Sequence, residues 1–177
     1  MTSEDGSAWT FASAGPNVLY AIAWSGAEYV AVGGELTGWI VSSKDGVTWT
    51  RRDIPGSLHP LYGVVWSGSE FLAVGAHGQI ERSADGVSWL EGSVGVDKSL
   101  FSVAWTGGLY EAVGEDGTAV ESADGLGWSA RTSGMAGDLY CAVWIDSRLF
   151  ALGRGGAILA GDCAAIGHRT QAIARTP

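Results

Sequence analysis

Four aspartates stand at nearly equal spacing along this 177-residue chain, and carboxylates are common general acids and bases in enzymes. Each lies in the same short motif, Ser-x-Asp-Gly-x-x-Trp. The four copies contain Asp5 with Trp9, Asp45 with Trp49, Asp85 with Trp89, and Asp124 with Trp128. An active site needs different residues in different roles, whereas this motif supplies one residue four times. We therefore expect structural turns, in which Asp accepts backbone hydrogen bonds, Gly adopts positive φ and Trp covers the turn.

Residues that differ among the repeat copies are better candidates for a binding site, because packing explains the positions that recur. The copies differ most in loops around 34–37, 76–77, 115–116 and 154–155, which we expect at one rim of the molecule together with the loops between units. The candidate ligand-binding residues at this rim are Trp39, Glu35, His77, Glu115, Asp116 and Arg154. Trp39 could stack a sugar ring or a flat apolar group, or it could pack between units or under the longer first loop.

The residue types at this rim are compatible with two kinds of chemistry. His59 and His77 could hold a metal together with Glu115 or Asp116. Glu35 and those two acids could supply the carboxylate pair of a glycosidase. No motif fixes either spacing, so we expect no catalytic residue, no metal and no cofactor.

The segments that must position these loops also repeat. The motif tryptophans are 40, 40 and 39 residues apart, and between them recurs a block that first reads Leu-Tyr-Ala-Ile-Ala-Trp at 19–24. Short apolar runs separated by Gly-containing turns predict four strands in each unit. Strict alternation places Tyr20, Ile22 and Trp24 on one face, and both faces are apolar. Radial stacking of sheets covers two apolar faces, and the period is that of a propeller blade, so we predict an all-β, four-bladed β-propeller with four-stranded antiparallel blades.

The ends of the chain indicate how such a ring could close. The chain begins with a motif and one strand, 7–12, whereas its last unit has three strands and no motif. We expect the N-terminal strand to complete the last blade, which covers a sheet edge. The predicted blades are 19–52, 61–92, 100–131, and 139–160 with 7–12, forming one domain at 1–160 before a partly disordered tail at 161–177. A monomer is expected, and the alternative is a dimer that forms an eight-bladed or swapped ring.

The repeated motif resembles the Asp box of the BNR repeat family, found in sialidases, sortilin-like receptors and photosystem II assembly factors. The resemblance covers about residues 3–160. The usual box has one more residue between Asp and Gly, and the shorter form is similar to that of bacterial propeller repeats of unknown function. The resemblance implies a propeller fold and hardly constrains the function.

Charge and composition restrict the partners. The chain has 10 Lys+Arg and 19 Asp+Glu, a net charge of −9 that repels nucleic acids and anionic membranes. Its apolar runs are too short for a membrane helix, and no signal peptide is expected, which leaves the compartment open. Cys141 and Cys163 are expected near opposite rims, too far apart for a disulfide.

These observations favour a non-catalytic binding or scaffold module that recognises a partner protein or a carbohydrate through its loop rim. Two alternatives stay open. One is a glycoside-acting enzyme of the broad sialidase-like group, which would depend on the rim carboxylates. The other is a recently amplified or engineered repeat without a selected ligand.

Overall fold

The computed structural model describes residues 3, 5–54, 56, 59–162 and 171–172. They form four antiparallel sheets of four strands, each with its strands side by side in chain order. This confirms the predicted all-β, four-bladed propeller. Within the described residues, no helix has the length and apolarity of a membrane span.

The strands lie close to the predicted positions. Blade 1 contains β1 (Leu19–Trp24), β2 (Tyr29–Gly33), β3 (Trp39–Ser43) and β4 (Thr50–Arg52). Blade 2 contains β5 (Leu61–Trp66), β6 (Phe71–Gly75), β7 (Gln79–Ser83) and β8 (Leu90–Ser93). Blade 3 contains β9 (Leu100–Trp105), β10 (Tyr110–Gly114), β11 (Thr118–Ser122) and β12 (Ser129–Thr132). Blade 4 contains β13 (Leu139–Ile145), β14 (Arg148–Gly153), β15 (Ala157–Asp162) and β16 (Gln171–Ala172). Short 3-10 turns η1 (Ala76–Gly78), η2 (Glu115–Gly117) and η3 (Arg154–Gly156) join the middle strands of blades 2 to 4.

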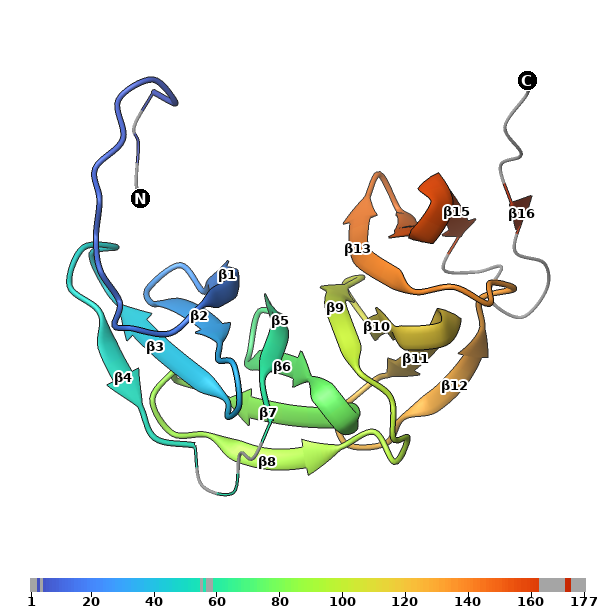
Figure 1. The fold of residues 1–177 in the computed structure, drawn as a ribbon, viewed down its shortest axis with the longest axis horizontal. Helices are drawn as coiled ribbons and strands as arrows, with labels where there is room; N and C mark the ends of the chain where they lie inside the picture. The colour runs from blue at the N-terminus through green and yellow to red at the C-terminus, as the bar shows by residue number, and fades with distance from the viewer. Residues whose placement is uncertain (1–2, 4, 55, 57–58, 163–170, 173–177) are drawn as a thin grey trace.

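The blades follow one another along a crescent (Figure 1). The inner strand of each blade packs beside that of the next, β1 with β5, β5 with β9, and β9 with β13. Blades 1 and 4 lie at the two ends of the crescent, with their inner strands apart (Figure 1). The described residues thus form an open arc of blades.

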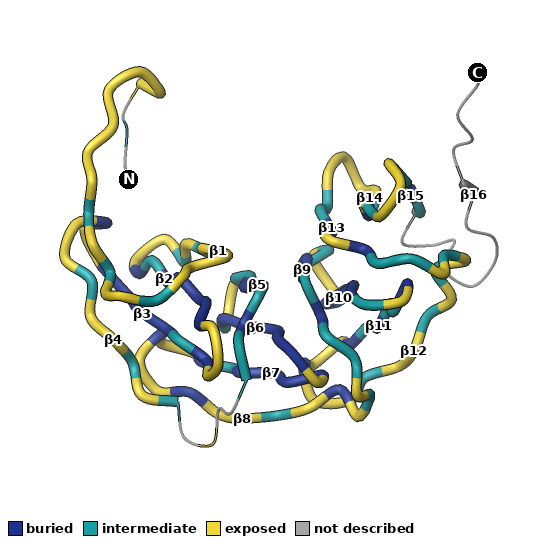
Figure 2. The backbone as a smooth tube through the Cα atoms, in the orientation of Figure 1, coloured by how far each residue is buried: buried dark blue, intermediate teal, exposed yellow. Residues whose placement is uncertain are grey.

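The core lies between the blades, as their two apolar faces require. Val32 and Ile40 of blade 1 pack against Leu61 and Phe71 of blade 2. The same positions recur between blades 2 and 3 and between blades 3 and 4. Buried segments therefore gather in the middle of the crescent, while its ends are more exposed (Figure 2). Because burying one Leu or Ile contributes roughly 1.5–3 kcal/mol, the three interfaces hold the arc together.

The outer edge of blade 4 corrects the prediction. Its fourth strand is β16, which pairs with β15. Among the described residues, 7–12 belong to no sheet, and they lie beside blade 1 at the other end of the crescent (Figure 1). The prediction failed because it required a ring closed within one chain, whereas the stacking of these blades keeps the two ends apart. Most of the tail predicted at 161–177 lies outside the described residues.

Candidate functional site

The loops that join the blades and the turns between the middle strands meet at one rim. In every blade, the N–H at the start of the middle turn donates to a carbonyl of the loop that precedes the blade. These bonds run from Gly34 to Val18, Ala76 to Pro60, Glu115 to Ser99, and Arg154 to Asp138, at 2.8–3.0 Å. The rim is therefore a row of backbone clasps that hold the variable turns in fixed positions.

The two histidines of blade 2 come together as expected. The ring centroids of His59 and His77 lie 4.5 Å apart, and His77 Nδ1 is 2.5 Å from Asp97 Oδ1. The acids expected to join them, Glu115 and Asp116, lie on blade 3 instead. No three His, Cys, Asp or Glu side chains in the described part of the chain are grouped as metal ligands. The histidine pair is a feature of the rim surface.

The acids of blade 3 pair with groups of their own blade and its flanking loops. Lys98 Nζ lies 2.6 Å from Asp116 Oδ2 and 3.7 Å from Glu115 Oε1, and Asp116 raises the pKa of Lys98. Glu115 Oε2 also accepts the backbone N–H of Ser99 at 3.1 Å. Glu35 is exposed on the turn of blade 1, away from this cluster. The three carboxylates considered for a glycosidase pair are therefore spread over two blades.

Trp39 is half-buried. The guanidinium carbon of Arg51 lies 4.2 Å from the centroid of its ring, and Gly15 lies against the ring edge. These contacts correspond to the packing alternative more closely than to an open stacking platform. Arg154 is exposed on the turn of blade 4, at the far end of the crescent from Trp39. The candidate rim residues thus follow the whole arc.

A row of aromatic rings along the inner strands was not anticipated. It consists of Tyr20, Tyr62, Phe101 and Tyr140, one from each blade, with consecutive ring centroids 5.4, 5.7 and 5.9 Å apart. Tyr20 and Tyr140 are exposed, and the middle two rings are half-buried. Tyr140 also donates its hydroxyl to Asp138 Oδ2 at 3.2 Å, which ties the row to the rim loops. Burial beside Tyr20 raises the pKa of Tyr62.

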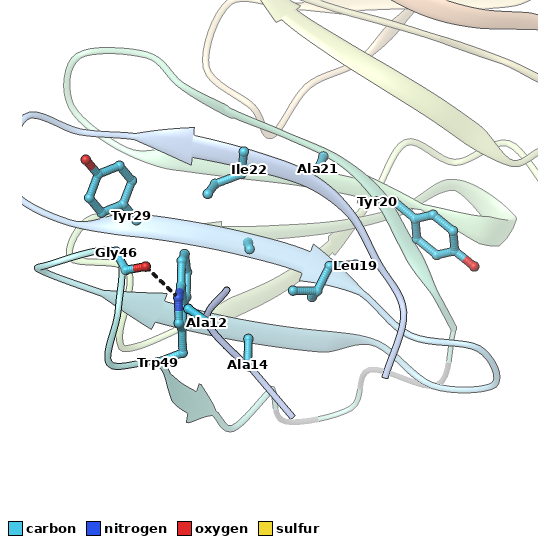
Figure 3. A pocket seen from close by; sticks show the side chains of 10 residues that line it. Ala12, Ala14, Leu19, Tyr20, Ala21, Ile22, Tyr29, Gly46 and Trp49 are labelled. Carbon is cyan, nitrogen blue, oxygen red and sulfur yellow. Dashed lines mark hydrogen bonds between the residues drawn. The ribbon is translucent and has the colours of Figure 1, made fainter. Parts of the chain in front are cut away.

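A β-bulge explains why strict alternation missed this inner aromatic row. Leu19 pairs with Gly33 and Ala21 with Val32, so Tyr20 has no pairing partner in the register. The same shift occurs at the start of β5, β9 and β13. Tyr20 therefore leaves the face that Ile22 occupies, and the expectation that they share a face was wrong (Figure 3). The recurring Leu-Tyr or Leu-Phe pair was the available signal.

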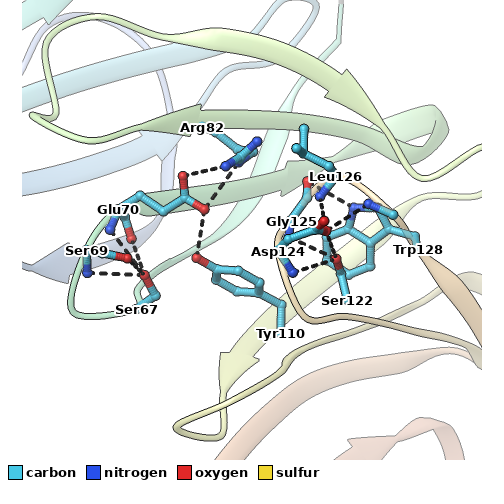
Figure 4. Close-up of polar contacts among 11 residues, drawn as sticks. Ser67, Ser69, Glu70, Arg82, Tyr110, Ser122, Asp124, Gly125, Leu126 and Trp128 are labelled. Atoms are coloured by element: carbon cyan, nitrogen blue, oxygen red, sulfur yellow. Dashed lines mark hydrogen bonds and ion pairs between the residues drawn. The ribbon is translucent and has the colours of Figure 1, made fainter.

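The repeated motif builds the same turn each time. Asp85 Oδ1 accepts the backbone N–H groups of Val87 and Ser88, both at 2.8 Å, and the Trp89 indole N–H donates to Gly86 O. The equivalent bonds to the Asp124 turn appear in Figure 4. At Asp45, the N–H groups of Thr48 and Val47 hold the pKa of the carboxyl well below its usual range.

A polar network links blades 2 and 3 beside this turn (Figure 4). Arg82 donates from Nη2 and Nε to the two carboxylate oxygens of Glu70, at 2.7 and 3.2 Å. The Tyr110 hydroxyl of the next blade donates to Glu70 Oε1 at 3.0 Å. Such a paired, hydrogen-bonded carboxylate fixes the relative position of the two blades.

The fold of this chain has counterparts among solved structures, although its sequence matches little that is known. No protein-family model matches it, and no curated protein does either. The structure described as YCF48 bound to D1 peptide is 16% identical and superposes with a TM-score of 0.65, over 88% of this chain and 52% of that one. This chain shares the fold of YCF48. YCF48 from Cyanidioschyzon merolae is 18% identical, with a TM-score of 0.55 over 66% of this chain and 37% of that one. The chain therefore spans about half the length of the first match and less of the second.

Two buried glutamates also escaped the sequence analysis. Glu81 and Glu111 are buried between blades, and burial raises the pKa of each to about 7. Gln79 Nε2 donates to Glu81 Oε1 at 2.7 Å, while Glu91 adds to the rise. Each glutamate occupies a position where other blades carry an apolar residue, such as Val120 for Glu81. This difference between the repeat copies is the sequence feature from which the two buried glutamates could have been predicted.

The Glu81→Gln variant is expected to change how stability depends on pH. Because the folded-state pKa lies above the ordinary 4.5, Glu81 is protonated in the fold at pH 5 and stability falls as the pH rises through 7. The amide cannot ionise, so the variant should match the parent at pH 5 and exceed it at pH 8 by about 2 kcal/mol. Urea unfolding at both pH values measures this, with exposed Glu35→Gln as the control. An equal difference at the two pH values would contradict the assignment.

Proposed function

We propose that this chain is a non-catalytic binding module that holds an extended, basic peptide of a partner protein along its inner aromatic row. The observation that carries the proposal is the continuity of the row, with one ring per blade at 5.4–5.9 Å spacing. Alternate side chains of an extended peptide lie roughly 7 Å apart, so successive side chains on one face can each meet a ring. Aromatic rings offer large contact area at low entropic cost.

The charge of the molecule supports a basic partner. Its net charge is −9, and the acids of the rim lie next to the row, since Asp138 is hydrogen-bonded to Tyr140. Asp97 and Asp116 lie on the same rim. An acidic field of this kind accelerates the approach of Lys- and Arg-containing segments and repels acidic ones. His77, Glu115 and Asp116 would then contact the peptide beside the row.

The likeness to YCF48 supports the class of partner. The structure of that protein contains bound D1 peptide, so a protein with this fold can bind a peptide. We also propose that the Ser-x-Asp-Gly-x-x-Trp turns are short Asp boxes with a purely structural role. The Asp side chains form their hydrogen bonds within the turn, as Asp85 does, so they are not available to a ligand. The aromatic row is then the better candidate for a ligand site.

A peptide array tests the proposal. Decapeptides with net charges from +4 to −4 would be screened with the chain, and the tightest would be titrated in solution. Basic peptides should bind, and Tyr62→Ala or Phe101→Ala should each weaken binding about 10- to 100-fold. Leu126→Ala, which removes an exposed apolar side chain from a turn on the outside of blade 3, should leave the Kd unchanged.

Two outcomes would overturn this function. If the aromatic variants bind the peptides as tightly as the parent, the inner row is not the site. If no peptide binds, but an oligosaccharide does and loses its affinity in the same variants, the row binds carbohydrate instead. Unfolding curves of each variant, taken in parallel, separate lost contacts from lost folding.

A further inference from the structure

The face of blade 1 that points away from blade 2 is apolar and partly exposed, with Ala12 and Ala14 of the N-terminal segment beside it. We call the side of each blade that packs on the preceding blade its front face, defined in blade 2 by Leu61, Val64 and Phe71, which are buried against blade 1. In blade 1 the equivalent Leu19 and Ile22 are 38% and 58% exposed. They line an open hollow of about 430 Å³ together with Trp49 (Figure 3).

The opposite end of the crescent presents the complementary face. The back face of a blade packs on the following blade, and in blade 1 it consists of Val30, Val32 and Ile40, all fully buried. The blade 4 equivalents of Val32 and Ile40 are Leu152 and Ile158, which are 41% and 49% exposed. The two free faces of the chain are therefore the two halves of the interface that the fold already builds three times.

The N-terminal motif is a turn that joins no strands. Asp5 accepts the N–H groups of Ser7 and Ala8 at 2.8 and 3.1 Å, as its counterparts do. In blades 1 to 3 such a turn connects the third strand to the fourth, whereas here the following Phe11 is 77% exposed. In blade 4 the fourth strand is β16, and the sequence between β15 and β16 contains no such motif.

The number of residues between this turn and β1 would place the turn at the outer edge of a blade that precedes blade 1. Leu19 at the start of β1 follows Trp9 by 10 residues, and the starts of β9 and β13 follow Trp89 and Trp128 by 11, so the N-terminal spacing is one residue shorter than that between consecutive blades. In blade 1, Ile40 pairs with Arg52 and Ser42 with Thr50. By the same register, Ile158 would pair with a residue equivalent to Ala12, and Ala160 with one equivalent to Thr10.

We propose that a second copy of this chain occupies both free faces. The back face of blade 4 in one protomer packs on the front face of blade 1 in the other, and residues 10–12 of that second protomer add to β15 in place of β16. Two such contacts close a two-fold ring of eight blades. The inner strands of blades 1 and 4 stand apart at the two ends of the crescent (Figure 1), so the blades of a second copy can lie between them. This inference does not depend on the proposed function.

Sedimentation equilibrium of the full chain tests the proposal. The parent should have twice the mass of the 18.3 kDa chain, and Ile22→Glu and Ile158→Glu should each yield monomers. Leu126→Glu, at a residue that is 68% exposed on a blade 3 turn, should remain a dimer. A parent that stays monomeric up to about 200 μM, or glutamate variants that keep the dimer, would overturn the proposal.

A disulfide distinguishes pairing between chains from closure within one chain. Ala12→Cys and Ile158→Cys would be combined in a chain whose Cys141 and Cys163 are replaced by Ser. Oxidation should give a covalent dimer on a non-reducing gel. An oxidised species with the mass of a single chain, or none at all, would contradict the exchange of residues 10–12 between copies.

Discussion

Leu100→Ala is expected to destabilise the chain by about 3 kcal/mol, whereas Leu19→Ala should cost about 1 kcal/mol. Leu100 is the first residue of the inner strand of blade 3, and Leu19 is the first residue of the inner strand of blade 1. Leu100 is fully buried against blade 2, so its removal leaves a cavity in a packed interface, while Leu19 faces the open hollow of blade 1. The difference between two equivalent positions isolates the contribution of the neighbouring blade.

Urea unfolding measures this difference. Both variants would be made in the Ile158→Glu background, so that no second copy covers Leu19. Leu139→Ala, at the equivalent and fully buried position of blade 4, should resemble Leu100→Ala. Equal losses at Leu19 and Leu100 would mean that the front face of blade 1 is covered in the isolated chain, which contradicts the open arc.

Gly114→Ala should be as damaging, with an expected loss of roughly 3 kcal/mol. The backbone here is extended, with φ at −171°, so alanine meets no strain from φ itself. Its Cβ would instead overlap the carbonyl oxygen of Ser99, which accepts the Glu115 N–H in the backbone clasp of blade 3. The nearest contacts are all backbone atoms of Ser99 and Leu100, so no flexible side chain can move aside to make room.

Gly108→Ala is the matched control for Gly114→Ala. Gly108 lies in a hairpin turn of the same blade, and an added Cβ there meets no atom within 4 Å. Thermal unfolding should show a large fall in Tm for Gly114→Ala and a change of a degree or two for the control. Retention of the parent Tm by Gly114→Ala would show that the clasp is dispensable.

The regular part of this fold could be predicted from sequence because it is local and repeated. Each apolar run and each Asp-Gly turn specifies its own strand or hairpin, and four copies reinforce one pattern, so the strands lie near their expected positions. Closure of the ring is different, because it depends on how far each blade rotates from the last. The last blade was expected to lack a fourth strand of its own and to take it from 7–12, whereas β16 supplies that strand and 7–12 joins none of the four sheets.

The candidate site was predicted less completely. The variable loops do meet at one rim, since backbone clasps repeat in every blade. The inner aromatic row was missed because a single bulged residue, such as Tyr20, reverses the side on which its ring lies. Trp39 was selected as an aromatic residue outside the repeat, yet Arg51 and Gly15 pack against its ring. Contacts of this kind arise between strands and cannot be read from spacing along the chain.

The binding surface can be located directly by NMR. Aromatic and backbone resonances of the chain would be followed during titration with the tightest basic decapeptide from the array. The inner aromatic row predicts that the largest shifts occur at Tyr20, Tyr62, Phe101 and Tyr140 and extend to the neighbouring rim loops. Shifts confined to the outer strands β4, β8 and β12, with the four rings unchanged, would contradict the proposed site.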